Sequence, residues 1–245
     1  MKKCSFFFFL MFLFLPNCTP PPRGKVSVSP QTPLLQASSS HSQSLRFLAL
    51  GDSYTIGESV SVQERWPCQL IHLLKKEGFS LSEPEIIART GWTTDELIAE
   101  IQQKNPQGPY SMVSLLIGVN NQYRGRSLDE YRQQFIQLLQ KAIAFADQSP
   151  KKVLVLSIPD WGQTPFAEGR DRLQIYQQID QFNQVNREET QKIGAFYLDI
   201  TPITRQGLQD PSLMALDGLH PSGTMYRLWA EQALPITKKM VQSFK

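Results

Sequence analysis

Cysteine is scarce in this sequence. Three cysteines occur among 245 residues, and two of them, Cys4 and Cys18, lie close to the N-terminus. Cys68 therefore has no partner for a disulfide within the rest of the chain. It stands with Trp66 and Leu70 in a helical pattern, which favours a buried, unreactive side chain over a reactive thiol.

Histidine is equally scarce, and phosphate-binding loops are lacking. The three histidines, His41, His72 and His220, are far apart in the sequence, whereas a zinc site draws on clustered His and Cys ligands. The Gly-Asp-Ser turn at residues 51–53 lacks the further glycines or the lysine that would cradle a phosphate. We therefore expect neither a bound metal ion nor another cofactor.

The chain also lacks a cluster of basic residues. It carries 25 Lys and Arg against 22 Asp and Glu, a net charge of +3, and such a near-neutral chain lacks the electrostatic field that attracts a nucleic acid. Hydrophobic residues make up 41% and charged residues 19% of the sequence, which suits one globular domain with a sizeable core. We expect a monomer without a nucleic-acid partner.

No apolar stretch is long enough to cross a membrane as a helix. The apolar run near the N-terminus, residues 4–15, has 12 residues, whereas a bilayer core of about 30 Å needs about 20. Lysines precede it at positions 2 and 3, a pattern typical of a cleaved export signal, here residues 1–17. The segment closes with a motif that resembles the lipobox of bacterial lipoproteins, in which the cysteine is acylated: Leu15-Pro16-Asn17-Cys18.

This N-terminal segment predicts where the protein acts. Acylation would make Cys18 a membrane anchor, and residues 18–44, rich in Pro, Ser and Gln, would form a tether between the membrane and the domain. We expect an exported protein of the bacterial cell envelope, lipid-anchored on the periplasmic or surface side. The alternative is simple secretion, with Cys18 removed or left unacylated.

From residue 45 to residue 245, strands and helices alternate. Short apolar runs bounded by Gly, Pro or polar residues predict five strands, at residues 46–50, 85–88, 112–117, 152–156 and 195–198. Apolar residues at helical spacing predict helices at residues 63–77, 94–103, 127–145, 172–192 and 222–240, the last with a kink or break at Pro235. This alternation implies parallel strands with right-handed crossovers. We therefore expect an α/β protein: one three-layer α/β/α domain with a five-stranded parallel sheet.

Residues that carry chemistry follow the predicted strands. In a parallel sheet the functional crevice lies beyond the carboxyl ends of the strands, so the segments after the strands and the one before the last helix hold the candidate site residues. Four of these segments combine glycine with reactive or polar side chains: Gly51-Asp52-Ser53-Tyr54-Thr55, Arg89-Thr90-Gly91-Trp92, Gly118-Val119-Asn120-Asn121 and Asp217-Gly218-Leu219-His220-Pro221.

Ser53 is a candidate nucleophile, provided that a base removes its proton. Of the three histidines, His41 lies in the tether and His72 in an early helix, so elimination points to His220 as that base. Asp217 precedes His220 by three residues and can orient the imidazole and fix its tautomer. Taken alone, Asp217 could equally well cap a helix.

These motifs, in this order, resemble the SGNH hydrolases, which are also called GDSL esterases and lipases. The resemblance covers residues 45–245 and implies a flavodoxin-like α/β/α fold with a catalytic triad of Ser53, His220 and Asp217. It also implies an oxyanion hole formed by the backbone N–H groups of Ser53 and Gly91 and by the side-chain amide of Asn120.

Two residues beside the predicted catalytic groups have other expected roles. Asn121 stands where the family usually has an aspartate, which removes a charge and leaves Asn120 unchanged. Asp52, next to Ser53, is expected to order the turn rather than to transfer protons.

The resemblance implies a serine esterase that cleaves carboxylic esters through an acyl-enzyme intermediate. Because the triad contacts only the acyl carbonyl, the substrate stays open between a lysophospholipid, a short-chain ester and an O-acetylated glycan. The alternative is a non-catalytic envelope lipoprotein that binds a ligand in the same cleft. Aromatic residues that could line this pocket, or pack in the core instead, are Tyr54, Trp92, Trp161 and Phe166.

Overall fold

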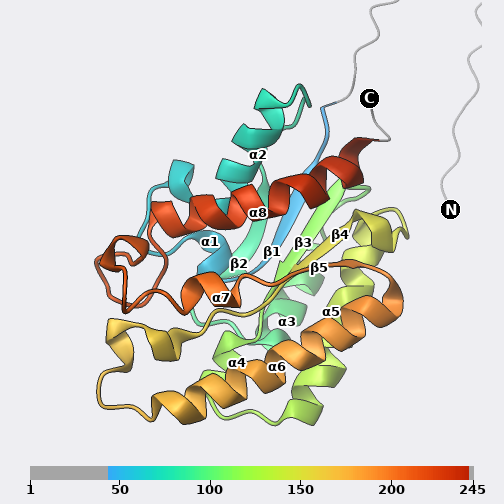
Figure 1. The fold of residues 1–245 in the computed structure, drawn as a ribbon. Coiled ribbons are helices and arrows are strands. Elements are labelled where there is room, and N and C mark those ends of the chain that lie inside the picture. Colours follow the sequence, from blue (N-terminus) through green and yellow to red (C-terminus); the bar gives the residue numbers. More distant parts are fainter. Residues whose placement is uncertain (1–43, 243–245) are drawn as a thin grey trace, which may run out of the picture. The chain divides into compact units, whose positions relative to one another are not determined.

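The computed structural model of this protein describes residues 44–242 (Figure 1). They form one five-stranded sheet, entirely parallel, in the order β2-β1-β3-β4-β5. The strands are β1 Phe47–Asp52, β2 Glu85–Arg89, β3 Met112–Leu116, β4 Val153–Leu156 and β5 Phe196–Leu198. The predicted export signal, almost all of the predicted tether and the predicted acylation site Cys18 lie outside the described residues.

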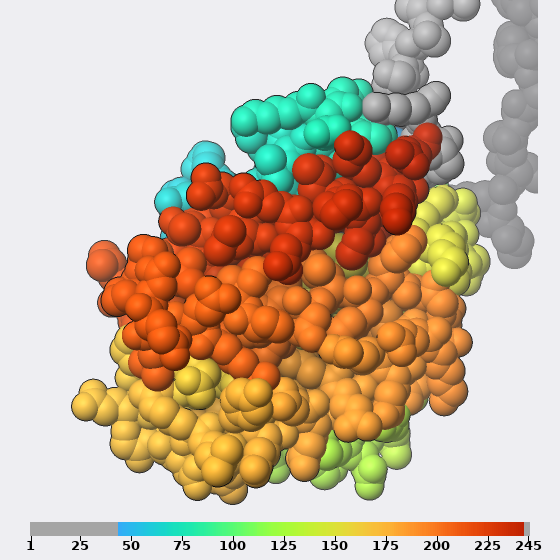
Figure 2. Space-filling model, in the orientation of Figure 1, coloured from blue at the N-terminus to red at the C-terminus, as the bar shows by residue number. Residues whose placement is uncertain are grey.

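Helices cover both faces of the sheet (Figure 1). One face carries α2 Trp66–Lys76 and α8 Gly223–Val241, which Figure 2 shows side by side. The opposite face carries α3 Thr94–Lys104, α5 Leu128–Phe145 and α6 Arg172–Ile193. Short helices follow three strands: α1 Ser53–Ile56 after β1, α4 Val119–Tyr123 after β3 and α7 Thr201–Thr204 after β5. None of the helices in residues 44–242 combines the length and the apolar character that a bilayer crossing requires.

The sheet forms the centre of the core. Strands β1, β3 and β4 are buried along their whole length, as parallel strands covered on both faces are expected to be. Each long helix adds an apolar stripe whose buried side chains stabilise the fold by about 1.5–3 kcal/mol apiece. Examples that are at most 1% exposed are Tyr131, Phe135 and Leu139 of α5 and Tyr226 and Trp229 of α8.

All five predicted strands and all five predicted long helices are present, which confirms the expected three-layer α/β/α fold. Helix α2 begins at Trp66 rather than at residue 63, because residues 62–64 form a separate 3-10 turn closed by a capping box between Ser61 and Glu64. The prediction that the last helix breaks at Pro235 is wrong. Helix α8 continues to Val241 because the residues beyond the proline still present a buried face to the core.

The prediction of a buried Cys68 side chain is only partly correct. This residue is half-buried, because its position on α2 falls at the edge of the stripe formed by the buried Trp66, Leu70 and Leu74. Partial burial, together with the negative charge of Glu83, raises the pKa of the thiol. The side chain therefore stays protonated and unreactive at neutral pH.

The order in which successive strands are added to the sheet reverses at β1, and this switch point places a crevice there. Strand β2 lies on one side of β1, and β3, β4 and β5 follow on the other side. At such a switch point the loops after neighbouring strands diverge and leave a crevice beyond the carboxyl ends of the strands. Helices α1 and α4 begin at this edge, which lies on the left of the sheet in Figure 1.

Candidate active site

Ser53 lies at the switch point, in the first turn after β1. It begins helix α1 and is only 4% exposed. Asp52 caps this helix by accepting the backbone N–H of Tyr54 at 3.0 Å. A Cβ atom at Gly51 would lie 2.1 Å from Oγ1 of Thr55, so a larger residue there would displace the turn. The close packing therefore holds the Ser53 hydroxyl at the edge of the sheet.

The structure brings Ser53, His220 and Asp217 into one line of hydrogen bonds. Nε2 of His220 lies 2.9 Å from Oγ of Ser53, and Nδ1 lies 2.7 Å from Oδ2 of Asp217. His220 is 6% exposed, and its imidazole packs on the ring of Tyr54 at 5.1 Å between centroids. With Nδ1 donating to the carboxylate, Nε2 is the nitrogen that can accept the serine proton.

The Asp217 carboxylate accepts four hydrogen bonds. Oδ1 accepts the backbone N–H groups of Leu219 and His220, both at 2.9 Å. Oδ2 accepts the hydroxyl of Ser59 at 2.5 Å in addition to the imidazole. Partial burial opposes ionisation, but the hydrogen bonds from Ser59 and His220 outweigh it and hold the pKa of Asp217 well below its usual range. The carboxylate is therefore charged at neutral pH.

Gly91 and Asn120 line the same cleft as the serine. Gly91 has a φ of +84°, a left-handed conformation that glycine adopts without strain, and its carbonyl oxygen accepts the guanidinium of Arg124 at 2.5 Å. Nδ2 of Asn120 donates to the carbonyl of Trp92 at 3.0 Å and to Oδ2 of Asp52 at 3.4 Å. The second of these bonds is long, so one amide hydrogen is available to a stronger acceptor.

Asp52 is a fully buried carboxyl group beside this amide. Burial disfavours its charged form and raises the pKa to about 7, although hydrogen bonds from Tyr54 and Asn120 favour ionisation. Asp52 is therefore partly protonated near neutral pH. Its bond to the N–H of Tyr54 agrees with the expectation that it orders the turn.

Aromatic side chains form one wall of the cleft. The ring centroid of Tyr123 lies 5.2 Å from that of Trp161 and 6.4 Å from that of Phe166. Tyr123 and Phe166 are 47% and 44% exposed, whereas Trp161 is buried and donates Nε1 to Gln122 at 2.7 Å. The cleft has a volume of about 160 Å³. Its further apolar lining residues are Val119 and Leu219.

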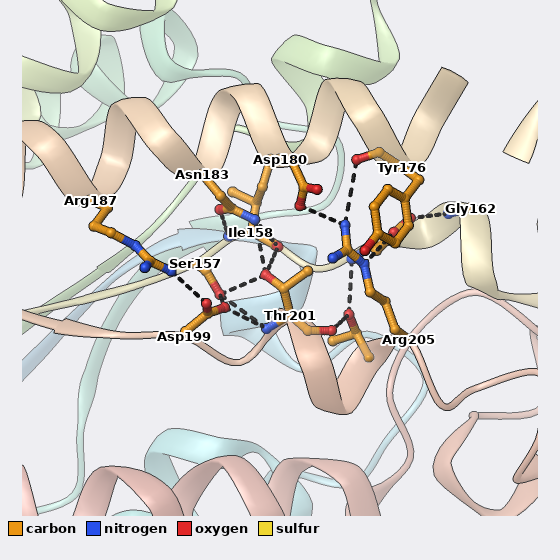
Figure 3. A network of polar contacts seen from close by, with 12 residues as sticks. Ser157, Ile158, Gly162, Tyr176, Asp180, Asn183, Arg187, Asp199, Thr201 and Arg205 are labelled. Atoms are coloured by element: carbon orange, nitrogen blue, oxygen red, sulfur yellow. Dashed lines mark hydrogen bonds and ion pairs between the residues drawn. The ribbon is translucent and has the colours of Figure 1, made fainter. Parts of the chain in front are cut away.

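A polar network at the carboxyl ends of β4 and β5 holds the loop that carries Trp161 (Figure 3). Asp160, which is fully buried, accepts Nε of Arg205 at 2.9 Å. The same guanidinium pairs with Asp180 of α6 at 2.7 Å and stacks on the ring of Tyr176. The wall of the cleft is thereby tied to both α6 and the end of α7.

One predicted pocket residue lies elsewhere. Trp92 packs its partly buried side chain against the core and contributes its carbonyl to Asn120, and it is not among the residues that line the cleft. The predicted aromatic residues that do line it are Tyr54, Trp161 and Phe166.

Three residues that contact the site were not identified from the sequence: Tyr123, Ser59 and Arg124. Tyr123 follows Asn120 by three residues on α4, so helical spacing could have placed both on one side of the helix. Ser59 and Arg124 had no such signal. The bond from Ser59 to Asp217 joins residues 158 positions apart, which no local pattern can reveal.

Comparison with known proteins agrees with this geometry. The fold and the family define the class of the protein as a carboxylic ester hydrolase. More narrowly, the chain belongs to the GDSL-like Lipase/Acylhydrolase family, whose model matches residues 49–228. The matched range includes every residue proposed to act on the substrate, namely Ser53, Gly91, Asn120, Asp217 and His220.

Solved structures share the fold at low sequence identity. The structure of TesA matches with a TM-score of 0.63 at 21% identity, over 80% of this chain and 99% of that chain. Axe2, an acetylxylan esterase from Geobacillus stearothermophilus, matches with 0.58 at 18%, over 78% and 93%. The psychrotrophic esterase EstA from Pseudoalteromonas sp. matches with 0.56 at 18%, over 80% and 98%. Among curated protein sequences no significant match is found.

The described part of the chain, residues 44–242, contains no group of three or more His, Cys, Asp or Glu side chains arranged to hold a metal ion. The candidate site consists of a hydroxyl, an imidazole, a carboxylate and amide donors around one cleft.

Proposed function

We propose that Ser53 is the nucleophile of a serine acylhydrolase, with His220 as its general base and Asp217 as the residue that orients the imidazole. The observation that carries the proposal is the continuous path from Oγ of Ser53 through the imidazole to Asp217, at 2.9 and 2.7 Å. Family membership favours this enzyme over a binding protein that uses the same cleft.

The reaction follows from these positions. Oγ of Ser53 attacks the ester carbonyl carbon while its proton passes to Nε2 of His220. The tetrahedral intermediate then collapses, and Nε2 returns the proton to the leaving alcohol. Water attacks the acyl-enzyme in the same way, with His220 as base, and releases the carboxylic acid. Asp217 stays ionised throughout and stabilises the imidazolium.

The negative charge that develops on the carbonyl oxygen in the tetrahedral intermediate is stabilised by hydrogen-bond donors that are already in position. We assign these to the backbone N–H groups of Ser53 and Gly91 and to the amide of Asn120, which line one cleft. The long contact from Asn120 to Asp52 can be exchanged for the oxyanion at little cost. A partly protonated Asp52 also places less negative charge next to that oxygen than an ionised carboxylate would.

We further propose that the acyl group is small, in the range from acetyl to butyryl. A cleft of about 160 Å³ is smaller than the roughly 300–1,000 Å³ of pockets that hold drug-sized ligands, which favours a short acyl group. The exposed rings of Tyr123 and Phe166 then offer a flat apolar surface to the alcohol part. Short-chain esters and O-acetylated glycans fit this cleft better than a lysophospholipid with a long acyl chain.

Labelling and two substitutions test the catalytic assignment. A fluorophosphonate probe is expected to label Ser53 covalently in the folded protein. Ser53→Ala is expected to keep the melting temperature and to lower kcat on p-nitrophenyl acetate by about 10⁴-fold or more. Asn120→Ala tests the oxyanion donor, with an expected loss of about 10²- to 10³-fold in kcat. Turnover retained by folded Ser53→Ala would contradict the proposal.

A panel of p-nitrophenyl esters tests the size of the acyl group. The value of kcat/KM is expected to fall by about tenfold or more from butyrate to decanoate, because extra methylenes do not fit the cleft. Equal or rising values would show that the acyl chain lies outside it.

We also propose that the protein is exported and anchored through an acylated Cys18, on the strength of its sequence motif. Mass spectrometry of the mature N-terminus tests this. An acyl mass on a terminal cysteine is expected, and an unmodified terminus beyond residue 18 would favour secretion instead.

A further inference from the structure

Ser59, in the loop after α1, contacts the carboxylate of Asp217, which lies 158 positions further along the chain. Its hydroxyl donates to Oδ2 of Asp217 at 2.5 Å, the same oxygen that accepts Nδ1 of His220 at 2.7 Å. The other carboxylate oxygen is held by backbone N–H groups of its own turn. Ser59 is therefore the side chain that fixes Oδ2 from a distant part of the chain.

The backbone at Ser59 indicates that the hydroxyl is held there against a conformational cost. Its φ of +65° lies in the left-handed region, which disfavours residues with a Cβ atom and which glycine adopts freely. Such a conformation persists only where the surrounding structure holds it, and it is often found at functional sites. Glycine at this position would relax the backbone and lose the hydrogen bond to Asp217.

We infer that Ser59 is a positioning residue for ester hydrolysis, whose hydroxyl holds the Asp217 carboxylate in the plane that His220 requires. The side chain of Asp217 is 32% exposed. Without the hydroxyl, Oδ2 faces water, which competes with the imidazole and lets the carboxylate rotate. This inference rests on the function proposed above.

A pH profile distinguishes this role from a purely structural one. Without the hydroxyl, a carboxylate that rotates and is solvated by water attracts the protonated imidazole of His220 less, which favours the neutral, active form at lower pH. Other titratable groups near the triad include Tyr54 against the imidazole, Tyr226 of α8, which interacts with Asp217 and with Glu58 beside Ser59, and Asp52. Asp52 bonds to Tyr54 and Asn120 rather than to Asp217, so its ionisation contributes equally to the profiles of the wild type and of a Ser59 variant.

The experiment compares Ser59→Ala with Ser59→Gly on a soluble short-chain ester. Both variants lose the hydroxyl, but only glycine relaxes the backbone. Both are expected to lower the plateau kcat by about three- to tenfold with KM nearly unchanged. The pH of half-maximal kcat/KM is expected to fall by about half a unit in both. Ser212→Ala is a matched control, because Ser212 donates to Asp210 at 2.6 Å outside the cleft, and its kinetics are expected to stay unchanged.

The possible outcomes separate the two proposals. If the wild-type protein is not labelled at Ser53 by a fluorophosphonate, the proposed function fails. If it is labelled and both Ser59 variants keep the wild-type plateau and pH profile, only the positioning role fails. A loss in Ser59→Ala that Ser59→Gly restores also overturns the inference, since the backbone would then be responsible.

Discussion

Asn121 shows how a single residue beside the site is matched to its surroundings. It is fully buried, its Oδ1 accepts the backbone N–H of Thr94 at 3.1 Å, and its Nδ2 donates to the Thr94 hydroxyl at 2.7 Å. That hydroxyl in turn donates to Oε1 of Gln134. Because the hydroxyl has only one proton and gives it to Gln134, position 121 must supply a donor. An amide does so and an ionised carboxylate does not.

Asn121→Asp is therefore expected to destabilise this protein, although aspartate is the usual family residue. The buried carboxylate would face an acceptor, and we expect the free energy of unfolding at pH 7 to fall by about 2–3 kcal/mol. Urea denaturation measures the change. Protonation would restore a donor, so the loss is expected to shrink at about pH 5. Equal stability of variant and wild type at pH 7 would contradict the assigned bond direction.

Asp52 predicts a pH-dependent stability. Its pKa rises from 3.8 to about 7 in the folded protein, so between these values the folded state holds the proton more often than the unfolded state. The stability that this proton provides is complete below about pH 4. It is lost as the pH rises to about 7, by on the order of 4 kcal/mol.

Asp52→Asn tests this contribution, because asparagine keeps an acceptor for the N–H of Tyr54 and does not ionise. From about pH 4 to about pH 8 the wild type is expected to lose several kcal/mol more of its free energy of unfolding than the variant. Urea denaturation at both pH values provides the comparison. Parallel losses in the two proteins would show that Asp52 ionises normally.

At the scale of elements, Arg205 connects the end of α7 to the loop after β4 and to α6 (Figure 3). Its partner Asp160 is fully buried and therefore depends on the guanidinium for neutralisation. Arg205→Met is expected to lower the free energy of unfolding by about 3–5 kcal/mol, because it leaves a buried charge unpaired.

The double variant Arg205→Met, Asp160→Asn is the matched control for that prediction. Removing both charges is expected to restore part of the lost stability. Since Asp160 precedes Trp161, the single variant is also expected to raise KM for short esters. A double variant less stable than the single one would show that Arg205 acts through its other contacts, to Asp180 and Tyr176.

At the scale of the whole molecule, the candidate site lies within one compact unit. The described residues, 44–242, lie in this unit, and all site residues fall between Gly51 and His220. A chain that begins at residue 44 is expected to fold and to hydrolyse a soluble ester with kcat/KM within about twofold of the chain of residues 1–245. Steady-state kinetics on both proteins measure this. A large loss would assign a role in catalysis to residues 1–43.

Much of the fold could be predicted because it depends on local patterns. Apolar runs predicted the five strands, and apolar residues at helical spacing predicted the long helices. The order of the strands could not be predicted, since it depends on which crossovers pack on each face. The continuity of α8 through Pro235 was missed for a related reason, because the burial of Val241 depends on tertiary packing.

The sequence by itself determined the chemical groups of the candidate site. Ser53, Asn120 and His220 stand in motifs at predicted turns, where residue type and order suffice to recognise them. Only the tertiary structure decided their distances, and it alone showed that Ser59 bonds to Asp217 and that Trp92 lies outside the cleft. The physical reason is that these contacts join segments far apart in the chain, and their geometry depends on how the crossovers pack around the sheet.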